Sequence, residues 1–310
     1  MVKRLLDCNP SDFASFSADD LLESIRYSEG RVVVCETIAL VQPLVDKVSN
    51  AELAAAFGAD ILIFNLYDVN APAIAGLPDV DSETAGGGFG HIPSGRGRTL
   101  ADVKAWVGRP VGLNLEPIEF PEAVTTSGRM AVPENAVKAV EQGADFLVIT
   151  GNPGTGVTRE GICRSIREIR AEIGRDALIF AGKGHAAGSL APVVAEGELE
   201  DYIEAGADII GLPAPGTIPG MTQEKASALV DRVHNHGALA LTLIGTSQEG
   251  ASPSTIEQIA LMSKMAGADM QHIGDAGTIG LAAPENIMAL SMAIRGRRHT
   301  WHRMAASLRR

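Results

Sequence analysis

The chain has 310 residues, 45% of them hydrophobic and 21% charged, and its 38 acidic against 26 basic residues leave a formal net charge of −12. This length and apolar content suit one large domain with its own core. Such an acidic surface disfavours binding to nucleic acid and to anionic membranes. The N-terminus lacks the apolar run of a signal peptide, no stretch suits a membrane span, and the three cysteines are scattered. We therefore expect a protein of the reducing cytoplasm.

Residues 1–30 form an N-terminal extension ahead of the first predicted strand. Ser17 precedes a helical stretch that carries Asp19 and Asp20 in its first turn. A serine cap and early acidic residues are typical of a helix N-terminus. We expect this extension to plug or flank the bottom of the fold that follows.

A repeated tripeptide, Gly-Ala-Asp, organises the rest of the chain; it stands at 58–60, 143–145, 206–208 and 267–269. Each copy follows a helical stretch and precedes a short apolar run, as expected where a helix ends at glycine and a buried strand begins. The last three copies follow one another at intervals of roughly 60 residues, which suits two βα units each.

Four further apolar runs lie between these copies, which brings the predicted strands to eight. The strands are predicted over 32–35, 61–66, 111–115, 146–150, 177–181, 209–212, 239–244 and 270–274. Eight apolar strands that alternate with helices predict a single (β/α)8 barrel over residues 1–310, in preference to an open doubly wound sheet.

The connection after the second strand, residues 69–98, is long and rich in glycine. Loops that follow barrel strands open onto the catalytic face, so this segment is a candidate lid. The alternative is a disordered loop or one that contacts another subunit.

Polar side chains gather where the predicted strands end, and some recur two residues apart, as in the pairs Asn114/Glu116, Thr150/Asn152 and Lys183/His185. Because strand residues alternate between two faces, such pairs are expected to point to one side, the barrel interior. The predicted catalytic residues are Glu36, Asn114, Glu116, Lys183 and His185, and the predicted substrate contacts are Asn65, Thr150, Asn152 and His272. The structural alternative is an internal Glu–Lys ion pair that only organises the barrel.

Roles follow from side-chain chemistry. Glu116 or Glu36 would remove a proton, and His185 would shuttle it. Lys183 would bind an anion, stabilise an enolate oxygen or form a Schiff base. Glu36 and Glu116 are also candidate ligands for Mg²⁺, although no firm metal ligand and no required cofactor is predicted. His272 suits a satisfied core histidine as well as a catalytic one.

The loops after the last two strands are predicted to bind a phosphate group. Their candidate residues are Gly245, Thr246, Ser247, Gly274, Gly277 and Thr278. Glycines there let backbone N–H groups approach an anion. Glu249 and Asp275 would repel a phosphate, and Lys183, Arg96 or Arg98 would have to compensate. The alternative is that these are plain turn glycines.

Part of the chain resembles the BtpA family of TIM-barrel proteins, through PVGLN at 110–114, GADF at 143–146, TG at 150–151 and VTREG at 157–161. That resemblance covers the middle third and implies a fold shared with ribulose-phosphate-binding barrels. A weaker similarity to phosphoenolpyruvate mutase-type barrels implies Mg²⁺-assisted chemistry on α-keto acids, but the acidic metal-binding run usual after their third strand is not evident. No catalytic residue transfers from either group.

Residues 296–310 form a basic C-terminal helix that we expect to be solvated, with Trp301 as a candidate subunit contact in a homo-oligomer. The function predicted is an enzyme that acts on a small phosphorylated sugar or keto-acid by enolate-type proton transfer, as an isomerase, epimerase or carbon–carbon lyase. One alternative is a Mg²⁺-dependent hydrolase or phosphoenolpyruvate mutase-like enzyme. Another is a non-catalytic barrel that binds a metabolite or a protein.

Overall fold

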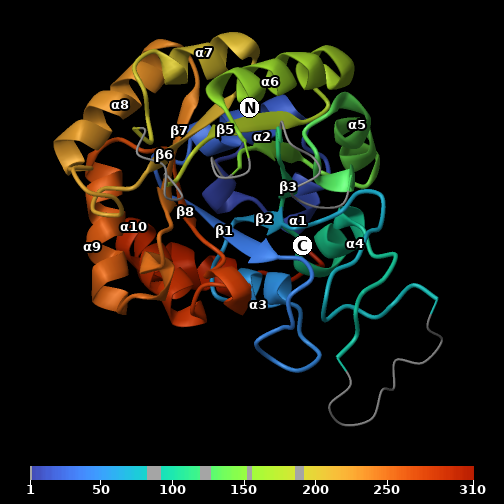
Figure 1. The fold of residues 1–310 in the computed structure, drawn as a ribbon. Helices are drawn as coiled ribbons and strands as arrows, with labels where there is room; N and C mark the ends of the chain where they lie inside the picture. Colours follow the sequence, from blue (N-terminus) through green and yellow to red (C-terminus); the bar gives the residue numbers. More distant parts are fainter. Residues whose placement is uncertain (1, 82–91, 119–126, 152–155, 186–191) are drawn as a thin grey trace.

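A computed structural model of the chain describes residues 2–81, 92–118, 127–151, 156–185 and 192–310. Eight parallel strands close into a barrel in chain order, with β1 paired to β8 (Figure 1). The predicted (β/α)8 barrel is therefore confirmed. The strands are β1 (Val32–Ile38), β2 (Ile61–Asn65), β3 (Val111–Leu115), β4 (Phe146–Ile149), β5 (Leu178–Gly182), β6 (Ile209–Pro213), β7 (Leu239–Ile244) and β8 (Met270–Ile273).

Helices surround this barrel, and local capping explains where several of them begin. Ser49 accepts a hydrogen bond from Glu52 N, and Thr158 accepts one from Gly161 N. Such caps satisfy N–H groups that have no partner inside the helix. The surrounding helices are α3 (Asn50–Ala56), α4 (Leu100–Val107), α5 (Pro133–Glu141), α6 (Arg159–Ile173), α7 (Glu198–Ala205), α8 (Gln223–Asn235), α9 (Pro253–Met265) and α10 (Pro284–Met304).

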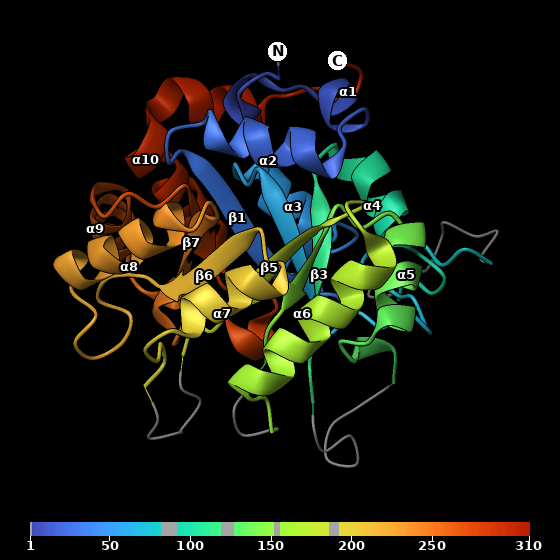
Figure 2. The same cartoon turned by 90° about the horizontal axis from the view of Figure 1, so that it is seen from above.

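Six further helical segments lie at the two ends of the barrel in the described part of the chain. η1 (Leu5–Asp7), α1 (Pro10–Phe13) and α2 (Ala18–Arg26) lie at the same end as both chain termini (Figure 2). η3 (Ser127–Arg129), η5 (Gln248–Gly250) and η6 (Gly277–Ile279) belong to loops that follow β3, β7 and β8.

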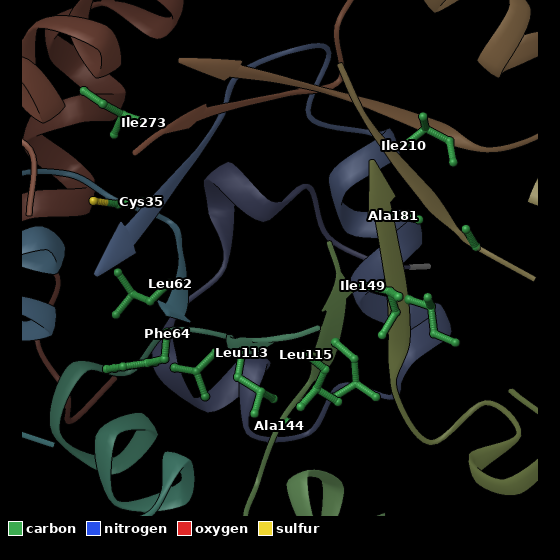
Figure 3. Close-up of a cluster of buried hydrophobic side chains, with 14 of the residues drawn as sticks. Cys35, Leu62, Phe64, Leu113, Leu115, Ala144, Ile149, Ala181, Ile210 and Ile273 are labelled. Atoms are coloured by element: carbon green, nitrogen blue, oxygen red, sulfur yellow. The ribbon is translucent and has the colours of Figure 1, made fainter. Parts of the chain in front are cut away.

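The strands build two separate cores because their side chains alternate between two faces. One face packs outward against the helices, and Figure 3 shows such side chains from several strands, among them Cys35, Leu113 and Ile273. The other face fills the barrel interior, where the Phe146 and Phe180 rings stack with their centroids 4.5 Å apart.

The N-terminal extension closes the interior core at the amino ends of the strands. Leu5, Leu21 and Ile25 belong to the same buried cluster as Val32 and Leu239, the first residues of β1 and β7. The interior of the barrel is thus occupied at this end, and open space is left at the carboxyl ends.

The aspartate of each Gly-Ala-Asp copy joins two neighbouring strands. Each lies just before an even-numbered strand, and its carboxylate accepts a hydrogen bond from a backbone N–H of the preceding odd-numbered strand. The bonds run from Val33 N to Asp60, from Val111 N to Asp145, from Ile179 N to Asp208 and from Ala240 N to Asp269, each at 2.8 Å. In return, the backbone N–H of each aspartate donates to the carbonyl of the strand residue whose N–H its carboxylate accepts. We call these four contacts the aspartate clamps.

Each clamp aspartate also pairs with one or more basic side chains. Asp145 pairs with Lys104, Asp208 with Arg170 and Arg175, and Asp269 with His234. The carboxylate of Asp60 is fully buried and pairs with Arg295 and Arg303. Burying a carboxylate is tolerated when hydrogen bonds and a cation compensate for lost hydration.

The basic C-terminal segment differs from the solvated helix that the sequence predicts. α10 turns at Gly296, where φ is 70°, and ends at Met304. Arg303 is buried, pairs with Asp60 and donates to the carbonyls of Leu5 and Cys8. The segment therefore seals the bottom of the barrel with part of its charge, while Trp301 stays exposed. None of the helices that the structure describes has the length and apolar character needed to cross a membrane.

The Asp60→Asn substitution is expected to lower the free energy of unfolding by about 3–5 kcal/mol, because it leaves two buried guanidinium groups without their carboxylate. Asp145→Asn is the matched control, since its partner Lys104 is 29% exposed and can rehydrate. Urea denaturation measures both. A loss at Asp145 as large as that at Asp60 would contradict this account of the clamp.

The Asp269 clamp is expected to weaken as pH rises. The hydrogen bond with Asp269 raises the pKa of His234 against the opposing effect of burial. The clamp contribution is therefore complete below the unfolded-state pKa of about 6.5 and is lost as pH rises through the higher folded-state pKa. Urea denaturation between pH 5.5 and 9 should show the stability advantage of the wild-type protein over His234→Gln shrinking with pH. A constant difference would refute the assignment.

Candidate active site

A cavity of about 1560 Å³ lies at the carboxyl ends of the strands, where residues from strand ends and the following loops line it. Its floor is the upper layer of the interior core, including Ile63, Val148 and Phe180. A typical small-molecule site measures roughly 300–1,000 Å³, so the cavity can hold a metabolite. This face carries the active site of characterised (β/α)8 enzymes.

Glu36 is the residue on which the described polar contacts of the cavity converge. Its carboxylate accepts a hydrogen bond from Asn114 Nδ2 at 2.6 Å and lies 3.2 Å from His272 Nε2. These partners come from β3 and β8, so three strands meet at one carboxylate. Burial opposes its ionisation, but the hydrogen bond and charge of His272, with Asn114 and His185, lower the pKa of Glu36 below its usual value. Glu36 is thus held as an anion.

Two other carboxyl groups, those of Asp275 and Glu249, also line the cavity, and their pKa values are raised whereas that of Glu36 is lowered. Asp275 accepts hydrogen bonds from Asn65 Nδ2 at 2.9 Å and from Gly277 N at 2.8 Å. Burial and the charge of Glu36 nevertheless raise the pKa of Asp275. Burial likewise raises the pKa of Glu249, with Asp275 adding to the effect. The sequence led us to regard both residues only as groups that repel phosphate.

Glu116 also lines the cavity, but it forms an ion pair with Arg129 from η3. The backbones interlock too, since Glu116 N donates to the Arg129 carbonyl at 2.9 Å. The Glu116 carboxylate is therefore already bound by an arginine of the protein. Arg129 was not foreseen from the sequence, because it stands well beyond the predicted strand and has no motif.

The structure corrects the expectation that Lys183 points into the cavity. Its ammonium lies 2.6 Å from the Glu198 carboxylate on α7, and Lys183 does not line the cavity. Leu178 and Phe180 point inward, so alternation directs Lys183 toward the helices. The apolar run of β5 is buried on both faces, and the sequence therefore contains no signal of this parity. On β7, Leu241 and Leu243 line the cavity, whereas Thr242 does not.

The remaining predicted contacts divide in two. Asn65, Thr150 and His185 line the cavity together with His272. Thr150 Oγ1 donates to the Gly182 carbonyl at 2.8 Å, which uses its hydroxyl proton inside the barrel wall. Asn152 lies outside the residues that the structure describes.

The predicted phosphate loops reach the cavity but offer little positive charge. Gly245, Thr246, Ser247, Gly274 and Gly277 line it, whereas Thr278 is exposed and does not. Glu249 and Asp275 belong to these loops and face the cavity. The arginines proposed to compensate lie elsewhere, since Arg96 pairs with Asp79, and Arg98 with Asp102.

Within the described part of the chain, no cluster of three or more His, Cys, Asp or Glu side chains is arranged to hold a metal ion. Glu36 and Glu116, the candidate Mg²⁺ ligands, each bind different protein partners. These residues do not fit a shared magnesium site, and we derive no step through one.

The candidate lid at 69–98 is described only in part, because 82–91 fall outside the described residues. Its described flanks are anchored: Ile74 and Leu77 are buried in the outer core, and Ala73 forms a β-bridge with Arg96.

A family model described as "Domain of unknown function (DUF7916)" matches residues 6–310. The chain belongs to this family. No curated protein matches the sequence, and membership in the BtpA family stays a prediction.

Solved structures share the fold at low sequence identity. The carboxyl transferase domain of Rhizobium etli pyruvate carboxylase has a TM-score of 0.51 at 12% identity, over 96% of this chain and 51% of that one. 2,3-Dimethylmalate lyase, a PEP mutase/isocitrate lyase superfamily member, has a TM-score of 0.50 at 16% identity, over 89% and 94%. Orotidine 5'-phosphate decarboxylase from Pyrococcus horikoshii OT3 has a TM-score of 0.49 at 17% identity, over 86% and 100%. The first two likenesses, at 12% and 16% identity, show a shared barrel fold and nothing about function.

Lys183→Met is expected to lower the free energy of unfolding by about 3 kcal/mol, because the Glu198 carboxylate is only 2% exposed and would lose its cation. The double variant Lys183→Met/Glu198→Gln should recover most of that loss. Urea denaturation measures both variants. If the double variant were as unstable as the single one, the ion pair would not explain the position of Lys183.

Proposed function

We propose that this protein is an enzyme that removes and returns a proton at a carbon next to a carbonyl group of a small polar substrate. This step is shared by isomerases, epimerases and carbon–carbon lyases. The observation that carries the proposal is the Glu36 carboxylate, which lines the cavity and is positioned by Asn114 and His272. A general base needs such a fixed carboxylate within reach of bound substrate.

The neighbouring groups supply the matching acid. Asp275 lines the same cavity, is fixed by Asn65 and Gly277, and has a pKa raised where that of Glu36 is lowered. Environments that push the pKa values of neighbouring groups apart assign a base and an acid. Glu36 takes the proton from carbon, the electron pair moves to the carbonyl oxygen, and Asp275 protonates that oxygen. His185 is close enough to influence Glu36 electrostatically and is the candidate for passing the proton on.

Several predictions of the sequence stand beside this proposal without adding to it. They are a phosphorylated sugar or keto-acid as substrate, no required cofactor, a homo-oligomer, and a cytoplasmic location. The charges around the cavity support the proposed proton transfer but not phosphate binding. Two carboxyl groups, Glu249 and Asp275, lie in the loops that the sequence predicts to bind a phosphate.

The test follows exchange of carbon-bound hydrogen for deuterium by NMR in D₂O, with a panel of small hydroxyketones, aminoketones and keto-acids. At least one compound should exchange faster with the protein than in buffer. Glu36→Gln should slow that exchange by about 10²–10⁴-fold, since it removes the base but preserves shape.

The matched control is Glu168→Gln, which makes the same change at an exposed position of α6 and should exchange like the wild type. Melting temperatures show whether both variants fold. A panel without accelerated exchange, or a folded Glu36→Gln with wild-type exchange, would overturn the proposed function.

A further inference from the structure

Four residues from β1, β8 and the loops after β7 and β8 form one wall of the cavity: Glu36, Glu249, His272 and Asp275. We call them the acidic wall. We propose that the acidic wall binds a protonated amine of the substrate. This inference rests on the proposed function for its place in a reaction, and it names the chemical class of the substrate, an amino-bearing carbonyl compound.

The first observation is a buried carboxyl group whose hydrogen bonding is incomplete. Glu249 is 6% exposed and lines the cavity, and its Oε2 atom has no hydrogen-bond partner among the described residues. Nδ1 of His272, also 6% exposed, has none either. An unpaired buried polar group costs roughly 1–3 kcal/mol, so two on the same wall indicate a missing partner.

The second observation is that this partner must be a hydrogen-bond donor. The unpaired Oε2 atom of Glu249 is a carboxyl oxygen, and a carboxylate oxygen only accepts hydrogen bonds. Carboxyl oxygens of Glu36 and Asp275 add further acceptors. An ammonium group offers three donors and a positive charge, which a hydroxyl group cannot match and a phosphate group opposes.

The third observation is that no lysine or arginine among the described residues pairs with this wall. Arg129 lines the cavity, but it pairs with Glu116 at the end of β3. Arg232 pairs with Glu200, and Lys225 lies exposed on α8. Glu36 has His272 as its basic partner, whereas Glu249 and Asp275 form no ion pair among the described residues. A cationic substrate group would lower their mutual repulsion.

The loop that carries Glu249 has a strained backbone conformation, which hydrogen bonds maintain. Thr246 and Ser247 adopt φ values of 60° and 70°, which non-glycine residues rarely do and which cost of order 1 kcal/mol each. Thr246 Oγ1 donates to the Thr217 carbonyl at 2.8 Å, and Asn286 Nδ2 donates to the carbonyl of Glu249 at 2.8 Å. Backbone strain that hydrogen bonds maintain is typical of a binding site. Here the strained loop carries Glu249 to the cavity.

Three ketones of equal carbon number test the inference because they differ in one substituent: aminoacetone, hydroxyacetone and hydroxyacetone phosphate. Their dissociation constants are measured at pH 7 by ligand-detected NMR. Aminoacetone should bind at least about tenfold more tightly than hydroxyacetone, a difference of about 1.4 kcal/mol, and hydroxyacetone phosphate should bind most weakly.

Glu249→Gln should reduce the preference for aminoacetone over hydroxyacetone by at least about fivefold while the protein keeps its melting temperature. Asp275→Asn is the second variant and should reduce it as well. The control Glu257→Gln, which makes the same change at an exposed position of α9, should keep the full preference. Equal affinities, tighter binding of the phosphate, no binding of any ketone, or an unchanged preference in both wall variants would overturn the inference.

The two proposals fail separately. Binding of aminoacetone without accelerated hydrogen exchange in any compound would overturn the proton-transfer function and leave the amine subsite intact. Accelerated exchange that depends on Glu36 but shows no preference for the amine would overturn the subsite and leave the proposed function intact.

Discussion

The aspartate clamp is the contact on which the arrangement of this barrel depends. Each clamp places a carboxylate between two consecutive strands at the same level, so the strands are joined in the pairs β1–β2, β3–β4, β5–β6 and β7–β8. A fixed contact at the start of each pair determines the register, and with it which residues of a strand point inward. The buried Asp60 clamp also draws Arg295 and Arg303 under the barrel and so ties the C-terminal helix to the N-terminal extension.

The site follows from that register. The N-terminal extension fills the amino ends and the stacked rings of Phe146 and Phe180 fill the centre, so the open space of the barrel lies at the carboxyl ends, where polar side chains line it. Glu36 from β1 meets Asn114 from β3 and His272 from β8, although these residues are far apart in the chain. Closure of the sheet, more than any local motif, creates the convergence.

The charges of the cavity then become unequal on its two sides. On the β3 side, Glu116 is neutralised by Arg129. On the side of β1 and β8, Glu36, Glu249 and Asp275 lie close enough to influence one another's ionisation, with His272 among them. A carboxylate with a lowered pKa beside two carboxyl groups with raised pKa values suits the proposed proton transfer, and the excess of acceptors suits the proposed substrate, which brings donors and positive charge. Both proposals thus rest on one arrangement of carboxyl groups.

The sequence by itself determined the barrel fold and the approximate positions of its eight strands. Fully apolar strands and the Gly-Ala-Asp repeat are local signals, because a buried strand and a helix end each leave a mark in a few consecutive residues. The inward position of Glu36, Asn114 and Glu116 was also predicted, since a polar residue near the end of a strand is expected to face the barrel interior and strand residues alternate between two faces. Tertiary structure alone decided the rest. A strand buried on both faces hides its parity, which is why Lys183 was placed on the wrong side, and the partners of Glu116 and of the four clamp aspartates come from distant segments. Whether a carboxyl group is paired, as Glu116 is, or left buried without a cation, as Glu249 is, depends on which chain segments the closed barrel brings together, and no short sequence pattern encodes that.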